Sequence, residues 1–136
     1  MPAGYSGTPL AKKLGIKEGF QILLYNQPTH YFELFADFPN HVHQLTETTS
    51  ESADFIHIFC TSHEELQTIG PTYKSALKKE GLLWVSWPKG ASSIPTDLKR
   101  DPIRTYFLDL GLVDVKVAAV DEDWSGLKFV YRRKDR

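Results

Sequence analysis

Three apolar stretches of strand length recur along the chain. They occupy residues 20–25, 53–60 and 82–87, and most of their positions are hydrophobic. A strand with one face in water alternates polar and apolar residues, whereas a nearly continuous apolar run is typical of a strand covered on both faces. The pattern therefore predicts three central strands with a layer of structure on each side.

Short capped segments precede and follow the first of these strands. Thr8 and Pro9 stand before residues 10–14 and Gly15 stands after them, which predicts a short helix with Thr8 as its N-cap. An aromatic-rich segment, residues 31–38, has the spacing of a helix that packs on the strand and stops at Pro39.

Two longer helices are predicted after the second and third strands. Ser62 and Glu65 form a capping box, followed by an apolar stripe that should break or kink at Gly70-Pro71 and close at Gly81. Asp101-Pro102 is a start signal for the last helix, and Gly111 is its stop signal.

The remaining strands are shorter or lie close together. Residues 41–45 are consistent with a short edge strand, and residues 46–52 with a polar loop. Residues 113–120 and 127–131 are two strands close enough in sequence to form an antiparallel hairpin.

This element order indicates an α/β fold. Parallel neighbours need helix-length crossovers, and these are right-handed. We therefore expect a single three-layer Rossmann-like domain over residues 1–136, with a mostly parallel sheet and a C-terminal antiparallel hairpin. Residues 1–7 are expected to be a mobile arm and residues 132–136 a basic tail. The order resembles a shortened methyltransferase fold, in topology alone.

Charge and composition narrow the classes of partner. The 16 Lys and Arg residues nearly balance 17 Asp and Glu residues, giving a net charge of −1. No global field would recruit nucleic acid or an anionic membrane, and no apolar run is long enough to span one. Without a secretory signal, the default expectation is a cytoplasmic protein. The only cysteine, Cys60, ends an apolar run and is expected to be buried.

Several segments are more distinctive than the fold pattern. They are AGYSGTPLAKKLGIKEG at residues 3–19, WPK at 87–89, TDL at 96–98, GLVDVK at 111–116, and Asp121 with WSGL at 124–127. Together they resemble the bacterial domain-of-unknown-function family numbered 3052, over nearly the whole chain. The resemblance implies a small bacterial α/β protein with no established activity. The positions that match family motifs are Lys89, Asp97, Asp121, Trp124, Ser125 and Gly126.

The topology predicts where a ligand would bind. Open parallel sheets bind ligands beyond the carboxyl ends of their strands, where the strand order reverses. The candidate binding residues at this edge are Asn26, Thr61, Ser62, Lys89, Ser92, Asp121, Trp124 and Ser125.

Each of the distinctive candidates has a structural alternative. Lys89 could bind an anion or be a solvated loop lysine. Asp121 could pair with Lys89, accept a ligand hydroxyl, or be an exposed turn carboxylate. Trp124 could stack on an aromatic ligand or cover the edge of the sheet. Ser62 could help to hold a phosphate, but the capping box already gives it a structural role.

The histidines give a weak metal pattern. His41 and His43 would share one face of a strand, and His30 or His57 could add a third ligand. His57 lies between two isoleucines and fits a hydrogen-bonded core histidine better. We therefore predict no metal site and no catalytic set, since no nucleophile elbow or phosphate loop is present.

Three functions are compatible with these observations. The first is a non-catalytic domain that binds a small anionic or aromatic ligand at the carboxyl edge, without a cofactor. The second is an S-adenosylmethionine-dependent methyltransferase-like enzyme, in which Glu47 could hold a ribose but residues 26–30 lack the glycines of a cofactor loop. The third is a protein interaction module that uses residues 1–14 and the basic tail, with an unknown protein partner.

Overall fold

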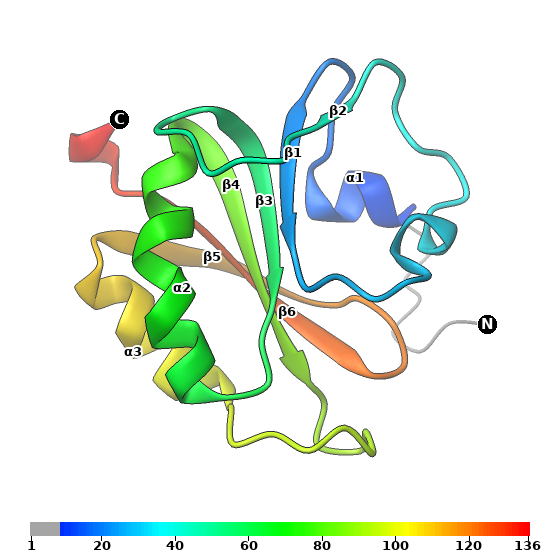
Figure 1. Cartoon of the computed structure of the whole chain (residues 1–136), viewed down its shortest axis with the longest axis vertical. Helices are drawn as coiled ribbons and strands as arrows, with labels where there is room; N and C mark the ends of the chain where they lie inside the picture. Colours follow the sequence, from blue (N-terminus) through cyan, green and yellow to red (C-terminus); the bar gives the residue numbers. More distant parts are fainter. Residues whose placement is uncertain (1–8) are drawn as a thin grey trace.

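The computed structural model describes residues 9–136, so the expected arm at residues 1–7 and the Thr8 cap lie outside the described residues. These residues form a six-stranded sheet with the order β2-β1-β3-β4-β6-β5 (Figure 1). The strands are β1 (Gln21–Tyr25), β2 (His43–Gln44), β3 (Ala53–Phe59), β4 (Leu77–Pro88), β5 (Leu112–Ala119) and β6 (Trp124–Tyr131).

The directions of the strands follow from the lengths of their connections. β2, β1, β3 and β4 are mutually parallel, whereas β6 runs antiparallel to both β4 and β5. A short turn can join only antiparallel neighbours, and the four residues between β5 and β6 form such a turn. The predicted α/β class, with a mostly parallel sheet and a closing hairpin, is confirmed.

Helices cover both faces of the sheet (Figure 1). Helix α1 (Leu10–Leu14) lies on one face, and α2 (His63–Ala76) and α3 (Arg100–Asp109) lie on the other. Each face has its own hydrophobic core, in which Leu14, Phe55 and Trp84 are fully buried on the α1 side and Leu66 and Phe107 on the α2 and α3 side. This burial on both faces explains why the central strands are nearly continuous apolar runs.

The aromatic segment after β1 is not the helix that its spacing predicts. Only the four-residue 3-10 helix η1 (Tyr31–Leu34) forms there. Tyr31 is buried against the sheet, and its ring lies 5.3 Å from that of Phe35, which in turn lies 5.0 Å from Phe38. The aromatic spacing therefore reflects a compact cluster of rings in an irregular segment that leads to β2.

Helix α2 runs through Gly70-Pro71 without the break that the sequence predicts. Pro71 has no N–H to donate to the carbonyl of Gln67, one turn earlier. The hydroxyl of Tyr106 on α3 donates to that carbonyl over 3.4 Å instead. Gly70 packs closely under α3, since a Cβ there would lie 3.0 Å from Cε2 of the Tyr106 ring.

Gly81 does not end α2, which stops at Ala76, but lies within β4. A Cβ at this position would lie 2.7 Å from Leu77 Cδ1 and 3.0 Å from the carbonyl oxygen of Asp54 on the neighbouring strand. The glycine therefore serves close packing between β3 and β4, and β4 is longer at its start than the apolar run indicates.

We expect Tyr106→Phe to lower the free energy of unfolding by about 1 kcal/mol, because the Gln67 carbonyl then loses its replacement donor. Urea denaturation monitored by circular dichroism measures this loss. The control is Tyr73→Phe. The Tyr73 ring also packs on the core, but its hydroxyl makes no hydrogen bond within residues 9–136. Equal losses in the two variants would contradict the role given to Tyr106.

His57 is the hydrogen-bonded core histidine that its isoleucine neighbours predict. It is fully buried on β3, with Nδ1 3.0 Å from the Tyr31 hydroxyl and Nε2 2.7 Å from Ser86 Oγ. Its ring stacks on Phe59 with 4.2 Å between the centroids. Burial lowers the pKa of His57 to about 3, so the imidazole is neutral at pH 7.

The expected burial of Cys60 is confirmed, since its side chain is fully enclosed at the end of β3. Burial, with the nearby carboxylate of Glu65, raises the pKa of the thiol to about 12. The thiol is therefore protonated and packs as a small apolar group.

Candidate functional site

The order of the strands reverses between β1 and β3. The chain passes from β1 to β2 on one side of this point and from β3 to β4 on the other. A crevice beyond the carboxyl ends of β1 and β3 is therefore where an α/β sheet of this type would hold a ligand. Asn26, Thr61 and Ser62 lie at this point.

Side chains bridge this crevice in the structure. The Asn26 amide donates to the carbonyl of Phe59 over 3.3 Å, which links the ends of β1 and β3. The Tyr25 hydroxyl donates to Glu65 Oε2 over 2.9 Å, and the Thr61 amide donates to Glu65 Oε1 over 2.9 Å. The carboxylate of Glu65 therefore joins the two strand ends to α2.

Ser62 and Thr61 have structural roles in these contacts. Ser62 is the N-cap of α2, and its hydroxyl accepts the Glu65 amide, as the capping box predicts. The carbonyl of Thr61 accepts the Thr96 hydroxyl over 2.7 Å and the Asp97 amide over 3.3 Å. These bonds hold the loop between β4 and α3 against the end of β3.

The residues after β1 do not fit a nucleotide-type cofactor in the crevice. Asn26 has φ +53°, a left-handed conformation that favours glycine, but its side chain occupies the space that a glycine would leave open. The following segment forms the 3-10 helix η1 in place of a longer helix whose N-terminus could face a phosphate or carboxylate. Glu47, the candidate ribose ligand, is exposed in the loop after β2.

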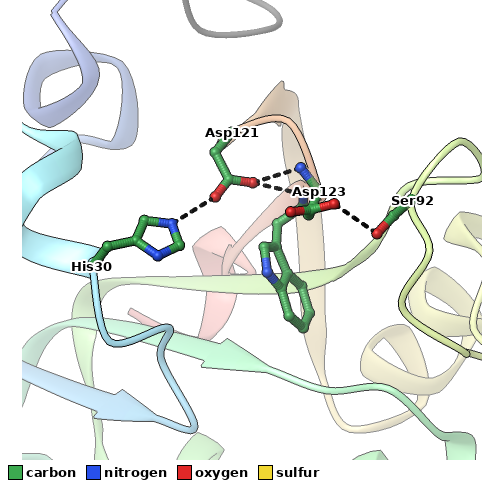
Figure 2. Close-up of polar contacts among 5 residues, drawn as sticks. His30, Ser92, Asp121 and Asp123 are labelled. Atoms are coloured by element: carbon green, nitrogen blue, oxygen red, sulfur yellow. Dashed lines mark hydrogen bonds and ion pairs between the residues drawn. The ribbon is translucent and has the colours of Figure 1, made fainter.

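The turn between β5 and β6 is organised around Asp121 (Figure 2). The carboxylate is largely buried, and its Oδ1 accepts the amides of Asp123 and Trp124 over 2.8 and 2.9 Å. Its Oδ2 lies 3.1 Å from Nε2 of His30, from the loop after β1. The pairing of Asp121 with Lys89 that the sequence allowed is therefore wrong: the partner is His30.

The opposite side of the same turn holds the loop after β4 (Figure 2). Asp123 Oδ1 accepts the Ser92 hydroxyl over 2.8 Å. The backbone carbonyl of Asp123 accepts the Lys89 amide, also over 2.8 Å. Asp121 and Asp123 therefore tie the loops that leave β1 and β4 to one hairpin turn. Lys89, Ser92 and Asp121 are brought together as the sequence predicted, although Asp121 contacts neither of the other two directly.

Trp124 belongs to the hydrophobic core. Its side chain is only 8% exposed and meets Phe59 edge to face, with the ring centroids 5.0 Å apart. This is the packing alternative considered from the sequence, and it leaves the indole unavailable for stacking on a ligand. Ser125 pairs with Trp87 and Ala119 in the sheet, and so lies within a strand and not in the turn.

A groove follows the loop between β4 and α3 over its whole length, from Trp87 to Arg100. Its wall contains three cations, two hydroxyl side chains and one indole: Lys89, Lys99, Arg100, Ser92, Thr96 and Trp87. Both hydroxyls are already hydrogen-bonded: Ser92 donates to Asp123 and Thr96 to the Thr61 carbonyl, and each accepts a backbone amide of the loop. Arg100 pairs with Asp101, whereas none of the ion pairs within residues 9–136 involves Lys89 or Lys99.

The N-terminus of α3 opens beside this groove. Its N-cap is Lys99, whose side chain cannot accept a hydrogen bond from the first turn. The first backbone amides, Lys89 and Lys99 contribute positive charge on this side, which suits an anion, while Asp101 in the first turn of α3 offsets part of the charge of Arg100.

Sequence reasoning missed the acid–base pair and part of the groove. His30 was considered only as a metal ligand, and Asp123, Lys99 and Arg100 were not singled out. The Asp-x-Asp spacing at residues 121–123 is a turn signal that points to a hydrogen-bonded turn. No local pattern gives the partner of Asp121, because His30 lies 91 residues away in the sequence.

The histidines do not converge on a metal. His41 contacts Glu18, while His30 and His57 have the separate partners given above. No group of three or more potential metal-ligating side chains occurs in the part of the chain that the structure describes. Among the helices of residues 9–136, none is long and apolar enough to cross a membrane.

Comparison with solved structures identifies the fold. A SAM-dependent methyltransferase from Aquifex aeolicus matches 88% of this chain over 86% of its own, with a TM-score of 0.61 and 15% identity. A ribosomal protein L11 methylase from Lactobacillus delbrueckii subsp. bulgaricus matches 91% of this chain over 75% of its own, with a TM-score of 0.60 and 10% identity. A magnesium protoporphyrin IX methyltransferase from Synechocystis PCC 6803, solved with bound SAH, gives a TM-score of 0.55 at 10% identity, over 90% of this chain and 78% of its own.

No family model and no curated protein matches the chain. The fold is identified by the solved structures: it is that of the SAM-dependent methyltransferases in a shortened form, as the topology predicted. At this identity the likeness concerns the fold alone.

Proposed function

We propose that this chain binds a small anionic ligand at the carboxyl edge of its sheet, in the groove between the end of β4 and the N-terminus of α3. The observation that carries the proposal is the set of cations that line the groove, Lys89, Lys99 and Arg100, next to the helix start that has no side-chain cap. A phosphate or carboxylate group has the charge and the acceptor oxygens that this arrangement favours.

The hairpin turn supports this use of the groove. Asp123 fixes Ser92 and the backbone of Lys89, so the wall of the groove is held by the same turn that binds His30 through Asp121. A preorganised wall loses less conformational freedom when a ligand binds. The indole considered for an aromatic ligand, Trp124, is packed in the core, so the proposal keeps only the anionic ligand.

S-adenosylmethionine-dependent methyl transfer is the second candidate, and the likeness to solved methyltransferases favours it. The bridge from Asn26 to Phe59 across the crevice argues against it, because an adenosyl group placed there would have to displace that bridge. The resemblance to the family of unknown function adds no activity to either candidate.

The two candidates predict different results in amide NMR titrations of the labelled protein. Inorganic phosphate is expected to give saturable shifts over residues 89–100, because these residues line the groove. Lys89→Gln combined with Lys99→Gln is expected to weaken the affinity at these residues about tenfold, since each change removes a charged donor. Arg133→Gln, on the exposed C-terminal turn, is the matched control.

S-adenosylhomocysteine and S-adenosylmethionine are titrated separately. Saturable shifts at Asn26, Phe59 and Thr61 with either compound would overturn the proposal in favour of the methyltransferase-like enzyme. An unchanged response to phosphate in the double variant would also overturn it.

A further inference from the structure

A pair of lysines stands directly opposed across the C-terminal hairpin. Lys116 on β5 and Lys128 on β6 are register partners, although like charges facing each other across two strands destabilise a sheet. Lys128 is in turn the partner of Trp84 on β4, and its ammonium lies 5.9 Å from the centre of the indole. Trp84 belongs to the core on the α1 side, so the pair gathers on that face of the sheet.

Helix α1 brings a third lysine to the same place. The Lys116 ammonium donates to the carbonyl of Lys13 over 3.2 Å, and the Trp84 indole N–H donates to the next carbonyl, of Leu14, over 2.7 Å. The end of α1 therefore lies against the two lysines of the hairpin.

Lys116 acts electrostatically on both of the other lysines. Burial, and then the charges of Lys116 and Lys89, lower the pKa of Lys13. Burial, and then the charge of Lys116, lower the pKa of Lys128. A chain with a net charge of −1 thus concentrates positive charge where α1 meets the hairpin.

No ion pair within residues 9–136 neutralises the opposed lysines. Neither Lys116 nor Lys128 occurs in any of them. Asp114, the nearest carboxylate on β5, pairs instead with Arg104 of α3 over 2.9 Å.

We propose that Lys13, Lys116 and Lys128 bind a small phosphate-bearing ligand between the end of α1 and the β5–β6 hairpin. A phosphate group carries several acceptor oxygens and close to two negative charges, and lysine ammonium groups bind it as point charges. The like-charge pair, unfavourable in the free protein, becomes favourable once an anion lies between the two ammonium groups.

The size of the cluster favours a small ligand over nucleic acid. Nucleic-acid binding draws on phosphate contacts along an extended backbone, often six to ten of them. Here the three lysines lie together where α1 meets the hairpin, on a protein with a net charge of −1. None of these three lysines lines the groove of the proposed function, although Lys89 of that groove is near enough to lower the pKa of Lys13.

A purely structural role makes the opposite prediction about stability. Lys116 could serve to cap the last turn of α1, and Lys128 could serve to cover the Trp84 ring. In that case, replacing either lysine by glutamine would lower the stability of the protein and would leave ligand binding unchanged.

The test uses inorganic pyrophosphate as the probe, at constant ionic strength. Isothermal titration calorimetry measures its affinity for the full chain, and differential scanning fluorimetry measures Tm with and without it. Pyrophosphate is expected to raise the Tm of the wild-type protein and to shift the amides of residues 13, 116 and 128. Lys116→Gln and Lys128→Gln are each expected to weaken binding about tenfold or more.

Without pyrophosphate, the same two variants are expected to have a Tm equal to or above that of the wild-type protein, because the like-charge contact is relieved. Lys134→Gln is the charge-matched control, since Lys134 lies on the C-terminal turn η2 (Arg133–Asp135), far from α1 (Figure 1). Lys99→Gln separates the two proposals: it removes a cation of the groove and is expected to leave pyrophosphate binding at residues 116 and 128 unchanged.

Three results would overturn the proposal. They are no binding of pyrophosphate by the wild-type protein, unchanged binding by the Lys116 and Lys128 variants, and a lower Tm of these variants without the ligand. If a single-stranded oligonucleotide binds through the same lysines more tightly than pyrophosphate does, the partner is nucleic acid, and the proposal is equally overturned.

Discussion

Trp124→Ala is expected to lower the free energy of unfolding by about 3–5 kcal/mol. The indole is 8% exposed and contacts Phe59 of β3 in the core on the α1 side, so its removal leaves a cavity between β6 and the central strands. The sequence left open whether Trp124 stacks on a ligand or covers the edge of the sheet. In the structure the indole packs in the core, because β6 begins at Trp124.

Chemical denaturation of three variants checks the role of Trp124. Trp124→Phe retains a ring against Phe59 and is expected to lose less stability than Trp124→Ala. Lys89→Ala is the tolerated counterpart, with a change within about 0.5 kcal/mol, because the side chain of Lys89 lies at the surface of the groove. A Trp124→Ala variant as stable as Lys89→Ala would show that the indole does not hold the hairpin to the core.

His57 is expected to make the protein lose stability in mild acid. Burial lowers its pKa to about 3 in the folded state, whereas an unfolded histidine has a pKa of about 6.5. The unfolded chain therefore binds the proton more tightly. The contribution of His57 is fully present above about pH 6.5 and falls by about 1.4 kcal/mol per pH unit as the pH drops from there toward the folded-state pKa.

Comparison with His57→Phe isolates this contribution from that of the carboxylates. Unfolding free energies of both proteins are measured by urea denaturation between pH 7.5 and 4.5, and the wild-type curve is expected to fall more steeply. His57→Phe leaves two groups without a hydrogen-bond partner, the Tyr31 hydroxyl and Ser86 Oγ. Each of them is expected to lower the free energy of unfolding at pH 7 by about 1–3 kcal/mol. Adding Tyr31→Phe and Ser86→Ala should restore part of this loss. Parallel pH curves would contradict a neutral buried His57.

The elements that the sequence predicts well have local causes. The apolar runs that become β1, β3 and the second half of β4 are buried on both faces, and burial leaves a direct record in composition. The capping box before α2 is equally local, since Ser62 and Glu65 are three residues apart.

The predictions that were wrong depend on contacts with distant residues. Of the break or kink predicted at Gly70-Pro71, the break does not occur, and the Tyr106 hydroxyl of α3 donates to the Gln67 carbonyl there. Gly81 lies inside β4, where the backbone of β3 passes close to it. The helix expected at residues 31–38 is a cluster of rings instead.

The candidate site also has a part that the sequence predicts and a part that only the tertiary structure shows. Lys89, Ser92 and Asp121 could be named from the topology of a parallel sheet, because strand ends meet at one edge. The partner of Asp121, the burial of Trp124 and the groove beside α3 could not, since each depends on how segments far apart in the sequence meet.

By itself, the sequence determined the α/β class, the succession of most strands and helices along the chain and the edge at which polar strand ends gather, because burial periodicity and capping act over a few residues. Only the tertiary structure decided that Asn26 bridges the crevice, that His30 binds Asp121 and that Lys116 faces Lys128. The reason is physical: the position of a hydrogen bond or a charge contact across the fold is set by the packing and register of whole elements, which no local pattern records.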